Sequence, residues 1–515
     1  MMQGLPASGQ PLFTDTYRRL VSEAGVAEPR ARYQAAPPTV RERIVRCVWF
    51  DQSLATDRLR TDDGQRLRVL SPGWWNLEAG PDFRNAALRI GAGPVVKGDV
   101  EVHLNASLWH AHGHDADPSY NGVVLHVALW NDAGLSTVAT AAGATVPQLT
   151  LEPYLRTPLA ELADSVDPAE YPEAGEASLG RCHALLEQGK VTLEWLGLFL
   201  DHAGDQRIAD KARRIAARAA AADDDQLLYE AIAAGLGYKR NKAPALELAR
   251  RLPLAGLRER VGARPDGAPA ALAAEALLFG VAGLLPPSPN AAPDPAAAEH
   301  IEGLLRLWDT LGAGLADDAL APEQWSFDGT RPTNFPTRRI AAMARLAARH
   351  LEGGLSRAIR QAVGPAGGGH LAPRELARRR AQLLDFFLSL RDPFWDARTG
   401  FTSEPMPHGA RLVGADRAHT IIIDGLLPAL LYQARRDNAR AFEELLHQVF
   451  AAYPKLPSTS ITRFTTQRLF GRPEGELKLL RSARRQQGLY QLYTDFCDSE
   501  RATCDRCPLV RLLEG

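Results

Sequence analysis

The stretch from Gly80 to Val127 constrains the fold more than any other part of the chain. Its middle reads GDVEVHLN, in which Asp99, Glu101 and His103 alternate with apolar residues. Side chains alternate across a β-strand, so these three polar groups share one face of a strand and the apolar ones share the other. An earlier carboxylate, Asp82, opens another strand-like run. The segment therefore predicts neighbouring strands that carry carboxylates.

The spacing of apolar residues differs between the first third of the chain and the rest. The first third predicts one helix, several strands, a short helix ending at His112 and further strands. From Leu179 onward, apolar residues recur at helical spacing. At 515 residues the chain is expected to form two or three domains. We predict an N-terminal extension over 1–38, an α/β domain over 39–178 and an α-helical domain over 179–515. The expected strands are 67–70, 82–90, 98–104, 123–130 and 146–151, the first helix is 40–50, and the later helices include 193–220, 223–236, 270–284, 297–311, 337–351, 374–390 and 439–450.

The composition is that of a globular protein, with 45% hydrophobic and 23% charged residues. A formal net charge of -1 gives no overall attraction to nucleic acid, so any such binding requires local basic patches. No segment approaches the roughly 20 apolar residues that span a bilayer, and the first residues lack a secretory signal pattern. These features predict a soluble, cytoplasmic protein that does not bind membranes.

Two carboxylates on neighbouring strands form a hard-oxygen site of the kind that holds Mg²⁺ or Mn²⁺. Asp82 and Glu101 are the expected ligands, and metal-assisted hydrolysis of a phosphodiester is the reaction they suit. The plainer alternative is a half-exposed strand, with Asp82 capping the turn that Gly80 and Pro81 begin.

The order of a helix, strands with a carboxylate, a carboxylate-x-basic strand, a helix and a strand resembles the PD-(D/E)XK nuclease superfamily. The resemblance implies a restriction-endonuclease-like domain with a mixed sheet. It also implies that Asp82 and Glu101 are the metal ligands and that Glu42 is the acidic residue of the preceding helix. His103 stands where the family usually has lysine, and a neutral imidazole is weaker as a fixed charge. His126, in phase with Val124 and Trp130 on the strand 123–130, is expected to face the same site.

His110, His112 and His114 also invite a zinc interpretation, but their spacing does not complete the HxHxDH pattern of metallo-β-lactamases. A helix end lined with imidazoles is the alternative. A zinc hydrolase of a small substrate using His103, His112, His114 and His126 stays open as a further reading.

Cys497, Cys504 and Cys507 form a C-x6-C-x2-C cluster near the C-terminus. Clustered thiols in a cytosolic protein favour zinc or an iron–sulfur cluster. The spacing resembles the first three ligands of the endonuclease III-type iron–sulfur loop, without its fourth. Some iron–sulfur nucleases instead add one cysteine from far upstream, which implies Cys182 here. The expected cofactor is a structural [4Fe-4S] cluster or Zn²⁺.

Short basic runs are candidates for contact with a phosphate backbone, although most such runs are solvated helix faces. Arg338 and Arg339 follow Pro336 at a predicted helix start, where backbone amides favour anions. Lys239, Arg240 and Lys242 form a second candidate.

From Glu42 to Cys507 the chain also resembles an uncharacterised bacterial family, on the segments GPDFRNA, GDVEVH, WHAHGHDADPSYNGVVLHV and FDGTRPTNFPTRRIA. The leading interpretation is a metal-dependent nuclease of nucleic acid, with DNA favoured over RNA and a role in repair or processing. The alternatives are a catalytically degenerate nucleic-acid-binding or scaffold module of the same fold and the zinc hydrolase.

Overall fold

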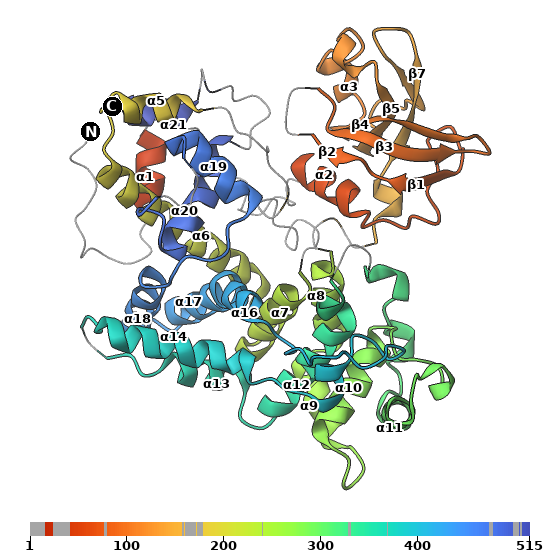
Figure 1. Cartoon of the computed structure of the whole chain (residues 1–515), viewed down its shortest axis with the longest axis vertical. Coiled ribbons are helices and arrows are strands. Elements are labelled where there is room, and N and C mark those ends of the chain that lie inside the picture. Colours follow the sequence, from red (N-terminus) through yellow and green to blue (C-terminus); the bar gives the residue numbers. More distant parts are fainter. Residues whose placement is uncertain are drawn as a thin grey trace. The chain divides into compact units, whose positions relative to one another are not determined.

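The computed structural model describes residues 16–23, 42–76, 80–156, 159, 171, 179–238, 240–327, 331–367, 369–472, 477–497, 504 and 507–514. The chain divides into two compact units, which are drawn in Figure 1. The sheet unit comprises Ala27–His183 and Thr459–Arg472. The helical unit comprises Met1–Val26, Ala184–Ser458 and Pro473–Gly515.

The sheet unit contains a mixed sheet of seven strands (Figure 1). The strand order is β1-β3-β4-β5-β7-β6, and β2 pairs with β3. Pairing is antiparallel from β1 to β4, but β4–β5 and β5–β7 are parallel. The strands are β1 (Leu67–Ser71), β2 (Trp74–Trp75), β3 (Phe83–Ile90), β4 (Val95–Asn105), β5 (Val123–Trp130), β6 (Thr137–Ala139) and β7 (Thr145–Thr150).

The two faces of the sheet differ in chemistry. On one face, Val100 and Val102 of β4 form a buried apolar cluster with Leu125 and with helix α2 (Glu42–Asp51). The alternate residues of the same strands, Glu101, His103 and His126, therefore point to the other face. There the short helix α3 (Leu108–Ala111) contacts β4 and buries Trp109. Helix α3 and the chain after it thus cover a polar row of the sheet.

The predicted strands are confirmed within a few residues, and β2 and β6 are additional. These two have only two and three residues, too short to give an alternating pattern. The turn before β3 depends on glycine, because Gly80 has φ +104°, a conformation that L side chains rarely adopt. This turn sets Asp82 directly before the first residue of β3.

The helical unit is built almost entirely from helices around one large apolar core. The helices predicted from Leu193 onward are confirmed, since their apolar spacing matches the buried positions. Helix α19 (Ser460–Phe470) belongs instead to the sheet unit, and α5 (Arg181–Glu187) contains a boundary between the units. The other α-helices are α1 (Thr16–Glu23), α6 (Leu193–Arg218), α7 (Asp224–Leu236), α8 (Lys242–Arg251), α9 (Leu254–Gly262), α10 (Ala270–Val281), α11 (Pro295–Leu311), α12 (Pro336–His350), α13 (Leu355–Val363), α14 (Pro373–Leu388), α15 (Pro393–Ala397), α16 (Ala415–Ile421), α17 (Leu427–Arg436), α18 (Arg440–Ala451), α20 (Ala483–Leu492) and α21 (Pro508–Glu514).

Within the described ranges, none of the helices is both long enough and apolar enough to cross a membrane.

Candidate functional site

Two buried carboxylates meet where β3 begins and β4 passes beside it. The Glu101 carboxylate accepts a hydrogen bond at 3.0 Å from the backbone N–H of Asp82. In return the Asp82 carboxylate accepts one at 3.0 Å from the backbone N–H of Val102. Asp82 and Glu101 are 7% and 4% exposed. The structure therefore brings together the two carboxylates that the sequence singled out.

Helix α2 contributes a third carboxylate and a cation to the same place. Arg46 Nε lies 3.0 Å from Asp82 Oδ1, and its Nη2 donates to Glu42 Oε1 at 2.7 Å. Glu42 and Arg46 are four residues apart, so they share one side of the helix. Glu42 was expected from the sequence, but Arg46 was not. Arg46 was missed because it lies among apolar residues of a helix and shows no motif of its own.

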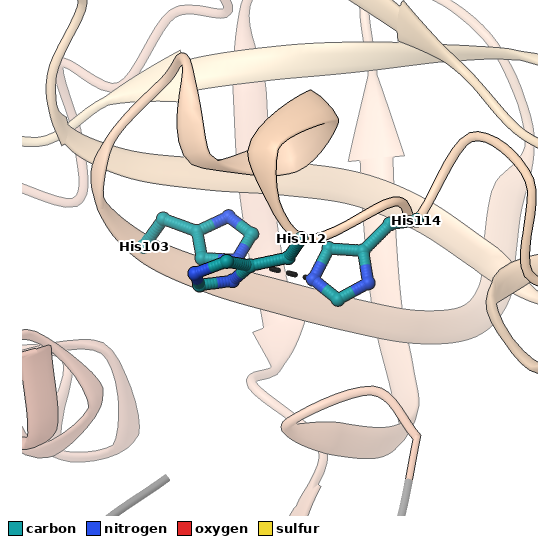
Figure 2. Close-up of side chains that lie close together, drawn as sticks. All are labelled: His103, His112 and His114. Carbon is teal, nitrogen blue, oxygen red and sulfur yellow. Dashed lines mark hydrogen bonds between the residues drawn. The ribbon is translucent and has the colours of Figure 1, made fainter. Parts of the chain in front are cut away.

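On the opposite side of Glu101, three histidines face one another (Figure 2). His103 follows Glu101 on β4, while His112 and His114 lie just after α3. Glu101 Oε1 is 3.5 Å from His103 Nε2 and 3.4 Å from His114 Nε2, and these two nitrogens are 3.3 Å apart. His112 completes a group whose potential ligand atoms all lie within 4.8 Å of one another.

The segment that carries His112 and His114 is fixed by its own contacts. Helix α3 begins after Ser107, and Ser107 is held by Asp132, which accepts hydrogen bonds from its N–H at 3.0 Å and from its hydroxyl at 2.6 Å. Trp109 is fully buried and donates from Nε1 to the carbonyl of Ala139 at 3.0 Å. His114 is buried beneath Tyr120, with ring centroids 3.8 Å apart. His112 is exposed to solvent.

A chain of hydrogen bonds leads from His103 across the sheet. His103 Nδ1 lies 3.0 Å from His126 Nε2, and His126 Nδ1 lies 3.1 Å from Gln148 Oε1. The Gln148 amide donates to Asp62 Oδ2 and to the Leu135 carbonyl, both at 2.8 Å. These residues were brought together by strand pairing, since His126 is directly opposite Gln148 in the β5–β7 ladder. Gln148 and Asp62 were missed because the strand register is not visible in the sequence.

Burial and neighbouring carboxylates or imidazoles shift the pKa values of the ionisable side chains in this cluster. Burial, followed by the charge of Asp82, raises the pKa of Glu101 well above its usual value. Burial also lowers the pKa of His126 and of His114 to about 4, and that of His103 well below its usual value. Neighbouring imidazoles act in the same direction. The three buried histidines are therefore neutral near pH 7, and their nitrogen lone pairs are available.

The four cysteines of the predicted metal site are divided between the units. Cys182 lies in the sheet unit, and Cys497, Cys504 and Cys507 lie in the helical unit. In the described part of the chain, none of the cysteines is joined in a disulfide. The tetracysteine site stays a prediction.

Arg338 and Arg339 lie inside the helical unit, where they are 0% and 4% exposed. Arg338 donates to five backbone carbonyls, including those of Arg398 at 2.7 Å and Ala410 at 2.7 Å. Arg339 donates to the carbonyl of Leu412. Both guanidinium groups are thus occupied by backbone carbonyls of the interior, and the predicted contact with a phosphate stays a prediction. Arg240 and Lys242 are half-buried near the start of α8, and Lys239 lies outside the described residues.

A family model described as a protein of unknown function (DUF2851) matches residues 42–457. The matched range contains every residue of the cluster around Glu101 and ends before the C-terminal cysteines. No curated protein and no solved structure matches the chain.

Proposed function

The chain belongs to the DUF2851 family of proteins of unknown function, and we propose that it is a divalent-metal-dependent hydrolase of phosphodiesters in nucleic acid. The observation that carries this proposal is the burial of Asp82 and Glu101 side by side. Burial, and after it the charge of Asp82, raises the pKa of Glu101, because two carboxylates in one buried place also repel each other. A divalent cation bound by both would relieve that repulsion, and oxygen ligands suit Mg²⁺ or Mn²⁺.

The order of elements supports the same proposal. Helix α2 with Glu42, then antiparallel β3 and β4 with Asp82 and Glu101, then parallel β5 and β7, is the arrangement that the PD-(D/E)XK resemblance implies. A metal held there would polarise a phosphate and lower the pKa of a bound water.

His103 is unsuited to supply the fixed positive charge that the usual lysine of that superfamily provides, because its pKa is lowered. We propose that Arg46 supplies this charge instead. Its guanidinium is always protonated and contacts both Asp82 and Glu42. A phosphate that displaces one of these carboxylates would meet a cation already held in position by α2.

The test is cleavage of labelled single- and double-stranded DNA and RNA by the purified full chain, with Mg²⁺, Mn²⁺ or EDTA. We expect metal-dependent cleavage that Glu101→Gln reduces on the order of 100-fold or more, because loss of a metal ligand removes several kcal/mol of transition-state stabilisation. Asp99→Asn is the matched control. Asp99 is on the same strand but pairs with Arg84 at 2.9 Å, outside the cluster.

Absence of cleavage by every metal, with salt-sensitive binding of nucleic acid intact, would contradict the hydrolase. It would instead favour the degenerate binding module. The bond from Arg46 to Asp82 is the observation that favours this second candidate, because it neutralises the carboxylate without a metal.

The four cysteines are proposed to hold a structural zinc ion or [4Fe-4S] cluster, on the clustering of Cys497, Cys504 and Cys507 and on the resemblance to iron–sulfur nucleases that implies Cys182. A closed site with four ligands leaves no position for a substrate, so its role would be to stabilise the fold. Metal and sulfide analysis of the wild type and of Cys504→Ser distinguishes the two cofactors.

A further inference from the structure

We propose that His103, His112, His114 and Glu101 form a binding site for one transition-metal ion of the zinc type. The three ligand atoms with measured separations, His103 Nε2, His114 Nε2 and Glu101 Oε1, make a triangle with sides of 3.3, 3.4 and 3.5 Å. Ligands at the usual zinc bond length of about 2.0–2.1 Å in a tetrahedral site lie about 3.3 Å apart. The triangle therefore matches one face of such a site.

The same separations are long for hydrogen bonds, although the two imidazole nitrogens of His103 and His114 are within hydrogen-bond range (Figure 2). Hydrogen bonds between nitrogen and oxygen are most often about 2.9–3.0 Å long. All three sides of the triangle exceed that length, although the groups are buried and packed closely. An ion placed among these three atoms would lie within bonding distance of all of them and would replace the long hydrogen bond between His103 and His114.

The hydrogen-bond chain across the sheet directs a lone pair toward this centre. The Gln148 amide nitrogen donates to Asp62 and to the Leu135 carbonyl. Its Oε1 therefore faces His126 and accepts a hydrogen bond from the N–H at Nδ1. Nε2 of the neutral His126 is then an acceptor, and it accepts a hydrogen bond from the N–H at His103 Nδ1. His103 Nε2 is therefore unprotonated and points at Glu101 and His114.

Such a chain is what supports ligands in known metal sites. A ligating histidine usually donates its remaining N–H to a protein acceptor, which fixes the tautomer and the orientation of the ring. Here the acceptor is His126, held in turn by Gln148. The Glu101 carboxylate is fixed in the same way, because its Oε2 accepts from the N–H of Asp82 and leaves Oε1 toward the histidines.

Three nitrogens and one carboxylate oxygen are a donor set that favours zinc and its first-row neighbours over magnesium. His112 is the exposed member of the group, so an ion can enter from solvent on its side. Figure 2 shows the three rings converging from β4 and from the chain after α3. The proposal of this metal site does not rest on the proposed hydrolase activity, because metal binding alone tests it.

The test is metal binding by the full chain after chelator treatment, titrated with Zn²⁺ and with Co²⁺, whose visible absorption reports tetrahedral coordination. We expect His112→Ala and His114→Ala to lose one bound ion relative to the wild type, with affinity reduced more than about 100-fold. His110→Ala is the matched control, since His110 is on the same segment but pairs with Asp115 at 2.8 Å. Gln148→Leu should weaken binding about 10- to 100-fold through the tautomer of His126.

Ions bound by the cysteines would stay in all of these variants and form a constant background. Equal metal content and Co²⁺ absorption in the wild type, His112→Ala and His114→Ala would overturn the proposal, as would an equal loss in His110→Ala. Cleavage of nucleic acid is a separate readout. Histidine-dependent zinc binding without cleavage would contradict the proposed function but would support this metal site. Cleavage without histidine-dependent zinc binding would contradict the metal site but would support the proposed function.

Discussion

Both units bury ionisable side chains, but they neutralise them in opposite ways. In the helical unit, Asp205 is paired with Arg484 at 2.5 Å and with His447 at 3.3 Å. Burial raises the pKa of Asp205, but the charge of Arg484 and the hydrogen bond from His447 outweigh it, so the pKa is lowered. In the sheet unit, Glu101 is buried beside Asp82, and its pKa is raised.

This difference separates structural polar groups from candidate functional ones. Opposite charges in contact stabilise the folded chain without any further partner. Two carboxylates in contact, as at the start of β3 and on β4, destabilise the folded chain unless a cation neutralises them. Strongly perturbed groups of this second kind are typical of functional sites. Four predictions test the comparison, from the largest expected effect to the smallest.

Removal of one member of the pair in the helical unit should have the largest effect. Arg484→Ala leaves the buried carboxylate of Asp205 without its main cation, and we expect a loss of about 3–5 kcal/mol in the free energy of unfolding. Denaturant unfolding followed by circular dichroism measures it. Arg436→Ala, which breaks an exposed ion pair with Asp224, is the control and should cost less than about 1 kcal/mol. Equal losses in the two variants would contradict the structural role of the buried pair.

Acidification should destabilise the sheet unit before the helical unit. The pKa of His126 is about 4 in the folded state against 6.5 in the unfolded chain, so its contribution to stability is lost as pH falls from about 6.5 to 4. That loss is on the order of 3 kcal/mol. The pKa of Asp205 is already below 3.8, so its contribution is lost only at more acidic pH. Hydrogen exchange of peptides from β4, β5 and α6 between pH 7 and 4 compares the units.

Glu101 acts in the opposite direction in that experiment, because a raised pKa favours the folded state as pH falls. The histidine effect is therefore isolated by repeating the measurement in Glu101→Gln, which lacks the opposing group. Simultaneous loss of protection in all peptides would show that the two units do not differ in acid.

Zinc should stabilise the sheet unit selectively. At a free concentration 100 times the dissociation constant, a ligand that binds only the folded state adds about 2.7 kcal/mol to the free energy of unfolding. We expect slower hydrogen exchange in β4 and in the chain after α3, and no such change in His112→Ala. Slower exchange in α6 and α20 alone would place the zinc effect in the helical unit.

The smallest expected effect is a gain in stability. Glu101→Gln removes a carboxylate beside Asp82 and keeps an oxygen to accept the backbone bond of Asp82. In the metal-free protein at pH 7 we expect stability to rise by about 1 kcal/mol, because like charges no longer repel. Thermal unfolding in the presence of a chelator measures it. A clear decrease would show that Glu101 is already neutralised by groups such as Arg46, as in the helical unit.

Local patterns in the sequence were sufficient to predict the longer strands of the sheet unit and many of the long helices of the helical unit. Alternation predicted β4 with Glu101 and His103 on one face, and helical spacing predicted α6, α7 and α12. These patterns are local because burial on one side of a strand or helix repeats every few residues. Short strands such as β2 carry no full period, and so they were not predicted.

The candidate site was predicted only in part, for the same reason. Asp82 and Glu101 were selected because carboxylates on neighbouring strands suggest a metal, and Glu42 because the PD-(D/E)XK resemblance implies an acidic residue on the preceding helix. His103 and His126 were selected because they are in phase on their strands. The contribution of Arg46, the position of Gln148 opposite His126, and the approach of His114 to Glu101 depend on register and on the path of the chain after α3. Neither is encoded in any short segment.

The sequence by itself determined the longer strands and many of the long helices, because hydrophobic periodicity reports which side of each such element is buried. It also determined that a carboxylate and a histidine share one face of β4. Only the tertiary structure decided which residues contact Glu101 and His103 on that face of β4. It placed His112 and His114 beside Glu101, and it placed Arg338 inside the helical unit among carbonyl groups. Those outcomes depend on contacts between residues far apart in the chain, whose geometry follows from packing of the whole unit.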